Sequence, residues 1–264
     1  MTTFIAAIDH SGGSTGGVLE RYGQEYTEQN KMELVHAMRL RMVNHTAFTG
    51  NQISHAILYK DTVDRGMVPV LESKGIRAIL KIDSGCAWDG SLKQFPVKQM
   101  CEYAVANDCV GTKMRSIVKS TSMVDLVVEQ QFVLAGTIAE HGLIPIIEPE
   151  VPIDHPQKEE VEEKLRKSLI KHLKDFNKKC ILKLTLPERP NLYRDLLLYN
   201  CVQKIVGLSG GYTTEEACRR LSMNADMSAS FSRALSEGLY VHQTDDEFDQ
   251  RLGQNIQDIL EACR

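Results

Sequence analysis

The sequence has no paired cysteine motif, no long apolar run and no excess of basic charge, and each absence excludes a class of protein. Its seven cysteines form no C-x-x-C pair, so we expect neither a zinc site nor a disulfide framework. No apolar stretch approaches the length that spans a bilayer. The net charge of -4 gives no electrostatic reason to expect nucleic acid or an anionic membrane as partner.

Further absences concern location and catalysis. The first residues, MTTFIAAIDHSGG, contain neither the basic segment nor the apolar segment of a secretion signal, so we expect a cytoplasmic protein. The eight histidines form no His-x-His or H-E-x-x-H motif, and we expect no metal. No G-x-G-x-x-G follows a predicted strand and no Walker sequence occurs, so we expect no cofactor.

What the sequence does contain is a series of short apolar runs rich in β-branched residues. Most are nearly continuous in apolar character, as expected of parallel strands that are buried on both faces. The eight runs are 4–9, 55–61, 77–83, 109–114, 143–150, 180–186, 204–210 and 227–232.

Segments with helical periodicity separate these runs. Apolar residues recur every three or four positions from Val161 to Phe176, and we interpret the charge run at 159–167 as the solvated face of that helix. Residues 31–43 and 246–263 also predict amphipathic helices. No linker divides the chain, so we expect a single domain over residues 1–264. Eight strand–helix units predict an α/β protein with a (β/α)8 TIM barrel, and an open doubly wound sheet is the alternative.

Polar side chains recur at the ends of the predicted strands. Residues two apart on a strand share a face, and the active site of a (β/α)8 barrel lies at the C-terminal ends of its strands. A single charged residue there often marks only where a strand leaves the core, but its recurrence on strand after strand favours a shared polar site. These residues are Asp9, Lys81, Asp83, Lys113, Arg115, Glu148, Glu150, Lys183 and Thr185.

The kinds of residue in this set indicate what the site can do. Basic side chains bind anionic groups, and carboxylates can transfer protons. A lysine amine attacks a ketone only when it is deprotonated, which an apolar environment or cationic neighbours favour. Lys183 lies between two leucines in ILKLTL, which favours it as the nucleophile, while Lys81 and Lys113 remain alternatives on chemistry alone.

Two glycine-rich turns follow predicted strands. Ser209-Gly210-Gly211 follows the seventh strand, where barrels often bind phosphate through backbone N–H groups. Arg233 follows the eighth strand and would supply positive charge there. Ser11-Gly12-Gly13-Ser14 follows the first strand and offers two hydroxyl groups. A phosphate site at the seventh and eighth strands is therefore expected.

At this point the motifs resemble those of class I fructose-bisphosphate aldolases, especially the compact bacterial branch. The matching stretches are AAIDHSGGST, ILKIDSG, GTKMRS, VVEQQF, GLIPIIEPEV, ILKLTLPERPNLY, IVGLSGGY and SASFSRAL, in order from residue 6 to residue 235. The resemblance implies a carbon–carbon lyase of glycolysis or gluconeogenesis. Such an enzyme reversibly cleaves fructose 1,6-bisphosphate to dihydroxyacetone phosphate and glyceraldehyde 3-phosphate through a Schiff base, without a metal.

The resemblance also implies a role for individual residues. Lys183 would form the Schiff base, Glu148 would be the general acid/base with Glu150 supporting it, and Asp9 would lie near the C4 hydroxyl group. The implied substrate-binding residues are Lys81, Lys113, Arg115, the C1-phosphate residues Ser209, Gly210, Gly211 and Arg233, and Ser11 and Ser14 for the other phosphate.

The expected partner is therefore a small sugar phosphate, and a homo-oligomer is compatible with the sequence. Two alternative functions stay open. One is a related lyase that acts on another ketose phosphate, such as tagatose 1,6-bisphosphate, and the other is a non-catalytic sugar-phosphate-binding barrel. One departure from the pattern is His10, which stands where vertebrate members have a glutamate.

Overall fold

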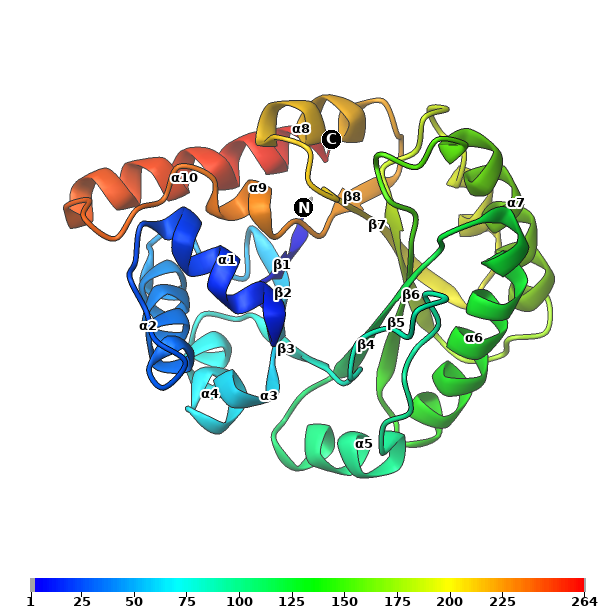
Figure 1. Cartoon of the computed structure of the whole chain (residues 1–264), viewed down its shortest axis with the longest axis horizontal. Helices are drawn as coiled ribbons and strands as arrows, with labels where there is room; N and C mark the ends of the chain where they lie inside the picture. The colour runs from blue at the N-terminus through cyan, green and yellow to red at the C-terminus, as the bar shows by residue number, and fades with distance from the viewer. Residues whose placement is uncertain (1–2, 264) are drawn as a thin grey trace.

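The computed structural model describes residues 3–263 and shows eight strands surrounded by helices (Figure 1). All seven ladders are parallel, and the strands pair in sequence order. This topology confirms the predicted (β/α)8 barrel, and the open doubly wound alternative is wrong. The strands are β1 (Phe4–Ala7), β2 (Ile53–Leu58), β3 (Arg77–Lys81), β4 (Gly111–Ile117), β5 (Ile144–Glu150), β6 (Cys180–Thr185), β7 (Val202–Leu208) and β8 (Met227–Ala229).

The chain joins the first strand to the last just beyond the end of β8. The N–H group of Ala7 donates a hydrogen bond to the carbonyl of Phe231 over 3.1 Å, and that of Ser230 donates to the carbonyl of Gly207 over 2.8 Å. The segment after β8 is therefore held against both β1 and β7. This brings the loops that follow these three strands to one side of the barrel mouth.

Helices cover the outside of the sheet (Figure 1). Three predicted helices correspond to α2, α7 and α10, each within a few residues of the expected bounds. No helix within residues 3–263 is long and apolar enough to cross a membrane. The helices are α1 (Gly13–Tyr22), α2 (Lys31–Asn44), α3 (Lys60–Asp64), α4 (Met67–Ser73), α5 (Val97–Ala106), α6 (Val124–Glu140), α7 (Lys158–Leu173), α8 (Thr214–Ser222), α9 (Arg233–Ser236) and α10 (Asp245–Ala262).

The connection between β6 and β7 departs from the predicted alternation of strand and helix. It contains a 3₁₀-helix, η2 (Arg194–Leu198), in place of an α-helix, and a shorter one, η1 (Thr121–Met123), precedes α6. Pro187 and Pro190 lie at the start of the connection, and each removes a backbone donor that an α-helix needs. Asn191 adds a left-handed backbone conformation with φ 62°.

The interior of the barrel is apolar at one end and charged at the other. Its apolar part consists of Ile5, Ala7, Ile57, Ile79, Ile146, Ile181 and Val206, which form a cluster of their own. The next inward positions on β5 and β6, two residues further on, are Glu148 and Lys183. Glu148 and Lys183 therefore lie directly above the apolar cluster, at the C-terminal ends of the strands.

Six predicted strands end one to three residues earlier than expected, among them β1, β2 and β8. β1 ends at Ala7, β2 at Leu58 and β8 at Ala229, whereas the apolar runs extended to residues 9, 61 and 232. The run at 55–61 is cut short because Lys60 begins α3. After the other two strands the chain leaves the ladder but continues along the mouth, so Asp9 lies on a loop and Arg233 is the first residue of α9.

Candidate active site

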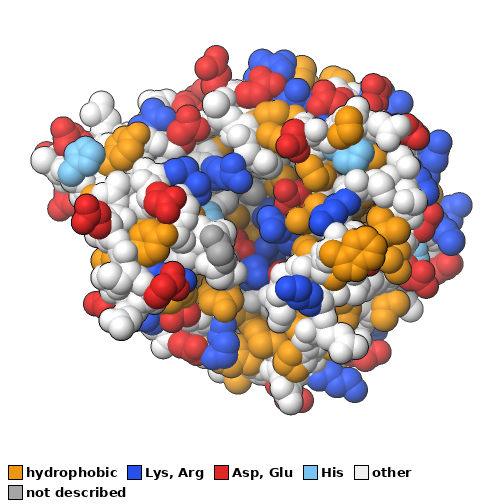
Figure 2. Space-filling model, in the orientation of Figure 1, with side chains coloured by type: hydrophobic (Ala, Val, Ile, Leu, Met, Phe, Trp, Pro, Cys, Tyr) orange, Lys and Arg blue, Asp and Glu red, His pale blue; other side chains and the backbone are white. Residues whose placement is uncertain are grey.

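A cavity of about 790 Å³ opens at the C-terminal ends of the strands. Figure 2 shows a hollow at the centre of this face with basic and acidic side chains inside it. The cavity is lined by all the residues to which the sequence assigned a catalytic or substrate-binding role, whereas Thr185 is not part of its lining. These residues are Asp9, Ser11, Ser14, Lys81, Lys113, Arg115, Glu148, Glu150, Lys183, Ser209, Gly210, Gly211 and Arg233.

Four charged side chains form a continuous buried row at the base of the cavity. Lys113 Nζ lies 2.7 Å from Asp9 Oδ2 and 3.2 Å from Glu148 Oε2. The other oxygen of Glu148 lies 3.0 Å from Lys183 Nζ. Parallel pairing produces this arrangement, because β4, β5 and β6 are neighbours and each contributes one inward side chain.

The two buried lysines, Lys113 and Lys183, differ in the carboxylates that surround them. Burial opposes the charge on Lys113, but Asp9, Glu148 and Asp83 outweigh it and raise the pKa of the ammonium group. Burial likewise opposes the charge on Asp9, and Lys113 and Lys183 lower the pKa of its carboxyl group nevertheless. Lys113 therefore stays protonated at neutral pH, which does not suit a nucleophilic amine. Lys183 touches a single carboxylate of the described chain.

Lys81 is held at the side of the mouth by the loop that follows its own strand. Its Nζ donates to Asp83 Oδ1 over 2.8 Å and to the carbonyl of Asp83 over 3.0 Å. The carboxylate of Asp83 also accepts from the N–H groups of Gly85 and Arg115. The lysine is therefore fixed as a cation facing the cavity.

The end of β5 carries the second glutamate. Glu150 Oε2 lies 3.3 Å from Arg115 Nη1 on the neighbouring strand. Burial raises the pKa of the Glu150 carboxyl group, Arg115 opposes this rise and the charge of Glu148 adds to it. The hydroxyl group of Thr185 bonds to both backbone groups of Val151, which fixes the chain just after Glu150.

The predicted phosphate turn follows β7, the strand that pairs with β6. Gly210 and Gly211 have positive φ of 59° and 116°, which an L side chain would strain. Arg233 Nη1 lies 3.0 Å from the point where a Cβ atom on Gly211 would stand. Because Gly211 has no side chain, the guanidinium group of Arg233 can lie against the turn. The positive charge of Arg233 and the backbone of the turn are therefore side by side.

The two serines after β1 form a local turn. Ser14 Oγ donates to the carbonyl of Ser11 over 2.8 Å and accepts from the N–H of Ser11 over 3.1 Å. Both lie at the cavity next to the N-terminus of α1. To donate to a ligand, the Ser14 hydroxyl must leave its bond to Ser11.

Several cavity residues were not assigned a role from the sequence, among them His10, Tyr59 and Arg21. His10 Nε2 lies 2.6 Å from Ser232 Oγ, and burial lowers the pKa of its imidazole to about 4, so the ring is neutral at pH 7. Tyr59 immediately follows β2, and its position at a strand end was the signal that could have found it. Arg21 lies on α1, for which we predicted no helix.

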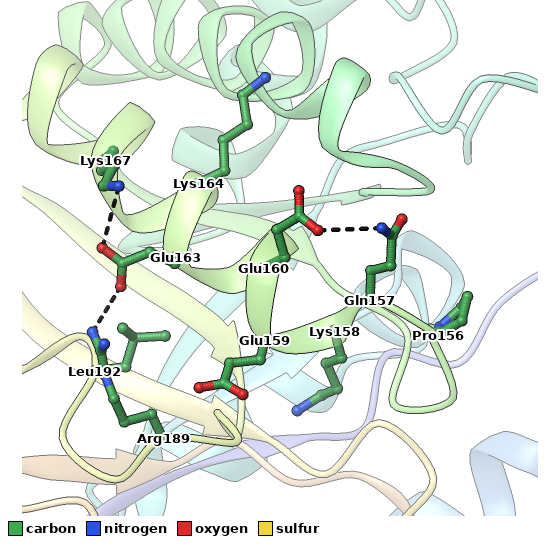
Figure 3. A pocket seen from close by; sticks show the side chains of 10 residues that line it. All are labelled: Pro156, Gln157, Lys158, Glu159, Glu160, Glu163, Lys164, Lys167, Arg189 and Leu192. Atoms are coloured by element: carbon green, nitrogen blue, oxygen red, sulfur yellow. Dashed lines mark hydrogen bonds and ion pairs between the residues drawn. The ribbon is translucent and has the colours of Figure 1, made fainter.

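A second hollow of about 700 Å³ lies beside α7 (Figure 3). Its charged groups pair with one another, since Glu163 contacts both Arg189, at 2.7 Å, and Lys167, at 3.7 Å. Its lining includes most of the charge run at 159–167, as expected of a solvated helix face. Glu162 is the exception, because it is fully buried and pairs with Lys158 at 2.7 Å. Within residues 3–263, no three His, Cys, Asp or Glu side chains gather as a metal site.

Comparison with known proteins adds a family to this geometry. No protein-family model matches the chain. The chain is 43% identical to fructose-bisphosphate aldolase class 1 of Clostridium acetobutylicum, over 98% of this chain and 94% of that protein. It is 43% identical to the protein of the same name from Synechocystis sp., over 98% and 93% of the two chains.

A solved structure agrees at the level of the fold. It is the fructose-bisphosphate aldolase of Plasmodium falciparum in complex with TRAP and a small-molecule inhibitor, which superimposes with a TM-score of 0.78 over 98% of this chain and 90% of that one. At 22% identity this likeness shows the barrel alone. The bacterial relatives span nearly the whole of both chains, and the chain therefore belongs to the class 1 fructose-bisphosphate aldolase family.

Proposed function

We propose that this protein cleaves fructose 1,6-bisphosphate through a Schiff base on Lys183. The observation that supports it most directly is the pair of Lys183 Nζ and Glu148 Oε1, 3.0 Å apart at the base of a cavity lined with cations. An amine next to a carboxylate is what imine formation needs, because protons must be moved at both nitrogen and oxygen.

The first half of the proposed reaction forms the imine. Lys183 passes a proton to Glu148, and the neutral amine adds to the C2 carbonyl of the open-chain sugar. The protonated Glu148 returns the proton to the C2 hydroxyl group, which leaves as water and produces an iminium ion. Lys113 keeps its own proton and holds the carboxylate of Glu148 in place.

The second half breaks the C3–C4 bond. A carboxylate removes the proton of the C4 hydroxyl group, the C4 aldehyde forms, and the electrons of the bond move to the iminium nitrogen. Asp9 is fully ionised and lies 2.7 Å from Lys113, which suits it to orient that hydroxyl group. Glyceraldehyde 3-phosphate leaves, the enamine is protonated at C3, and water releases dihydroxyacetone phosphate.

The remaining assigned groups bind the substrate. Lys81 and Arg115 lie on the rim as cations, and each is held by a neighbouring carboxylate. Arg233 and the turn Ser209-Gly210-Gly211 bind the C1 phosphate, while Ser11 and Ser14 approach the other phosphate. Fixing both ends of the sugar phosphate places C2 against the lysine and C4 against the acids.

A direct assay tests the reaction. Purified protein should produce dihydroxyacetone phosphate and glyceraldehyde 3-phosphate in equal amounts from fructose 1,6-bisphosphate. Faster cleavage of tagatose 1,6-bisphosphate would show that the preferred substrate is the sugar with the other configuration at C4. Absence of cleavage with both sugars would show a barrel that only binds sugar phosphates.

Metal removal should leave this activity unchanged. A Schiff base supplies the electron sink that a metal would otherwise provide, so prolonged treatment with EDTA should not reduce kcat. The measurement compares initial rates before and after chelation and dialysis. Loss of cleavage that zinc restores would contradict the Schiff-base mechanism.

Arg233→Ala should weaken binding of the C1 phosphate. A lost hydrogen bond to a charged group is worth roughly 1.5–3 kcal/mol, which corresponds to about a 10- to 150-fold rise in the apparent constant for fructose 1,6-bisphosphate. Fructose 1-phosphate should be affected similarly, because it keeps the same phosphate. A ketose that lacks this phosphate should be cleaved poorly and nearly equally by both proteins. Equal losses with and without the C1 phosphate, with a lower Tm, would show a structural role instead.

A further inference from the structure

Helix α1 presents one side to the cavity. Ser14, Gly17 and Arg21 all line the cavity, and their spacing of three and four residues places them on a single helix face. Arg21 therefore lies one helical turn after Gly17 and two turns after Ser14. It is a second guanidinium at the mouth that no motif of the sequence singled out.

The adjoining side of α1 fixes how this face is turned. Val18, Leu19 and Tyr22 are almost completely buried in the outer core. The end of the helix is also tied down, because the hydroxyl group of Tyr22 accepts from Arg41 over 3.2 Å and its carbonyl accepts from Val241 over 2.8 Å. Rotation of α1 away from the mouth would expose this apolar side, so Arg21 is held on the cavity side.

The side chain of Arg21 reaches back toward the mouth. Side chains on a helix lean toward its N-terminus, and here the lean directs the guanidinium over Gly17. Arg21 Nη1 lies 3.5 Å from the point where a Cβ atom on Gly17 would stand. Glycine at this position leaves the path along the helix open to the arginine.

The guanidinium groups of Arg21 and Arg233 line one cavity, and neither has a carboxylate partner in the described part of the chain. Burial and the charge of Arg233 lower the pKa of Arg21, and Glu20 opposes this effect only in part. In the described part of the chain no carboxylate lies within ion-pair distance of Arg21 or Arg233. Arginines elsewhere on the surface do have such partners, for example Arg219 with Glu216 at 2.7 Å. Unpaired like charges repel one another, and a bound dianion would attract both guanidinium groups and so offset their repulsion.

We propose that Arg21 and Arg233, which line the same cavity as the turn Ser209-Gly210-Gly211, bind the C1 phosphate of the ketose phosphate together. This inference rests on the proposed function and adds a specificity residue to it. The C1 phosphate is favoured over the other one because Arg233 lies against Gly211 of the turn assigned to that phosphate, whereas Ser14 lies two turns away from Arg21, toward the N-terminus of α1.

Trapping at Lys183 tests the inference without a cleavage assay. Dihydroxyacetone phosphate carries only the C1 phosphate, and dihydroxyacetone carries none. In Arg21→Ala, the concentration of dihydroxyacetone phosphate that gives half-maximal borohydride-trapped adduct should rise roughly tenfold, the lower end expected for one charged hydrogen-bonding group. Trapping of dihydroxyacetone should not change. Arg21→Lys keeps the charge but loses the planar fork, and its rise should be smaller, about threefold.

Arg219→Ala is the matched control, because it removes an exposed arginine that lies outside the cavity and is paired with Glu216. It should behave like the unmutated protein with both ketones. An unchanged response of Arg21→Ala to dihydroxyacetone phosphate would overturn the inference, as would an equal loss with both ketones. An effect on fructose 1,6-bisphosphate but not on fructose 1-phosphate would assign Arg21 to the other phosphate and overturn it too.

Calorimetric titration with orthophosphate separates this inference from the proposed function. If the unmutated protein forms no adduct with either ketone, the Schiff-base proposal fails. Weaker binding of orthophosphate to Arg21→Ala than to Arg219→Ala would in that case still support the paired-arginine site. Equal binding to the two variants would overturn it.

Discussion

Lys183→Met should abolish cleavage of fructose 1,6-bisphosphate, with kcat lower by on the order of 10⁵-fold or more. Methionine has a similar length and is apolar, and on the inward face of β6 it would follow Ile181 of the apolar barrel cluster. It cannot form an imine, and no other route places an electron sink next to C2. The loss should appear in kcat even at saturating substrate.

The fold should survive this change. Glu148 keeps its contact with Lys113 at 3.2 Å, so no buried carboxylate is left without a cation. Circular dichroism and the Tm of the variant would check this point. Borohydride reduction with dihydroxyacetone phosphate, followed by peptide mapping, should modify Lys183 in the unmutated protein and no residue in the variant.

Lys81→Met is the control for this experiment. Lys81 is tied to Asp83 at 2.8 Å and lies at the side of the mouth, so the variant should still form the adduct at Lys183. Stable labelling of Lys81 or Lys113 in the unmutated protein would reassign the nucleophile. Lys113 would then have to lose a proton that Asp9 and Glu148 stabilise, against the raised pKa of its ammonium group.

The barrel could be predicted because its strands are buried on both faces. Apolar runs such as 143–150 and 180–186 report that burial directly, and their order along the chain becomes the order of the sheet. Strand ends were less predictable, because the chain continues along the mouth after its ladder stops. The missing helix between β6 and β7 could have been predicted from Pro187 and Pro190.

The candidate site was predictable as a set of residues but not as a set of pairs. Inward positions on adjacent strands follow from alternation, and this brings Lys113, Glu148 and Lys183 together. Which carboxylate each lysine contacts depends on the register and tilt of the closed barrel, which no local pattern encodes. Arg21 was missed for a different reason. The segment Gly13–Tyr22 is rich in glycine and has no strong apolar period, so its helix face was not visible.

Glu148→Gln should lower kcat by roughly 10²–10⁴-fold, the usual contribution of one general acid–base group. Glutamine keeps the shape of the side chain but cannot carry a proton between Lys183 and the C2 hydroxyl group. KM should change much less, because the groups that hold the phosphates are untouched. Initial rates across a range of fructose 1,6-bisphosphate concentrations would separate the two constants.

The effect should be concentrated in dehydration rather than in attack by the amine. Glu148 is the single carboxylate of the described chain that pairs with Lys183. Glutamine cannot protonate the C2 hydroxyl group, so the carbinolamine should lose water slowly. Rapid mixing with dihydroxyacetone phosphate, followed by borohydride, would measure this step, since reduction traps only the iminium ion.

Glu150→Gln provides the comparison. Glu150 contacts Arg115 at 3.3 Å and is not paired with a lysine in the described chain. The kcat of Glu150→Gln should therefore fall less than the kcat of Glu148→Gln. A near-normal kcat in Glu148→Gln would show that another group moves the proton. Asp9→Asn would then be decisive, because Asp9 is the other carboxylate bound to Lys113. If Asp9→Asn carries the large loss in its place, the acid/base role belongs to the carboxylate at the end of β1 and Glu148 only positions the lysines.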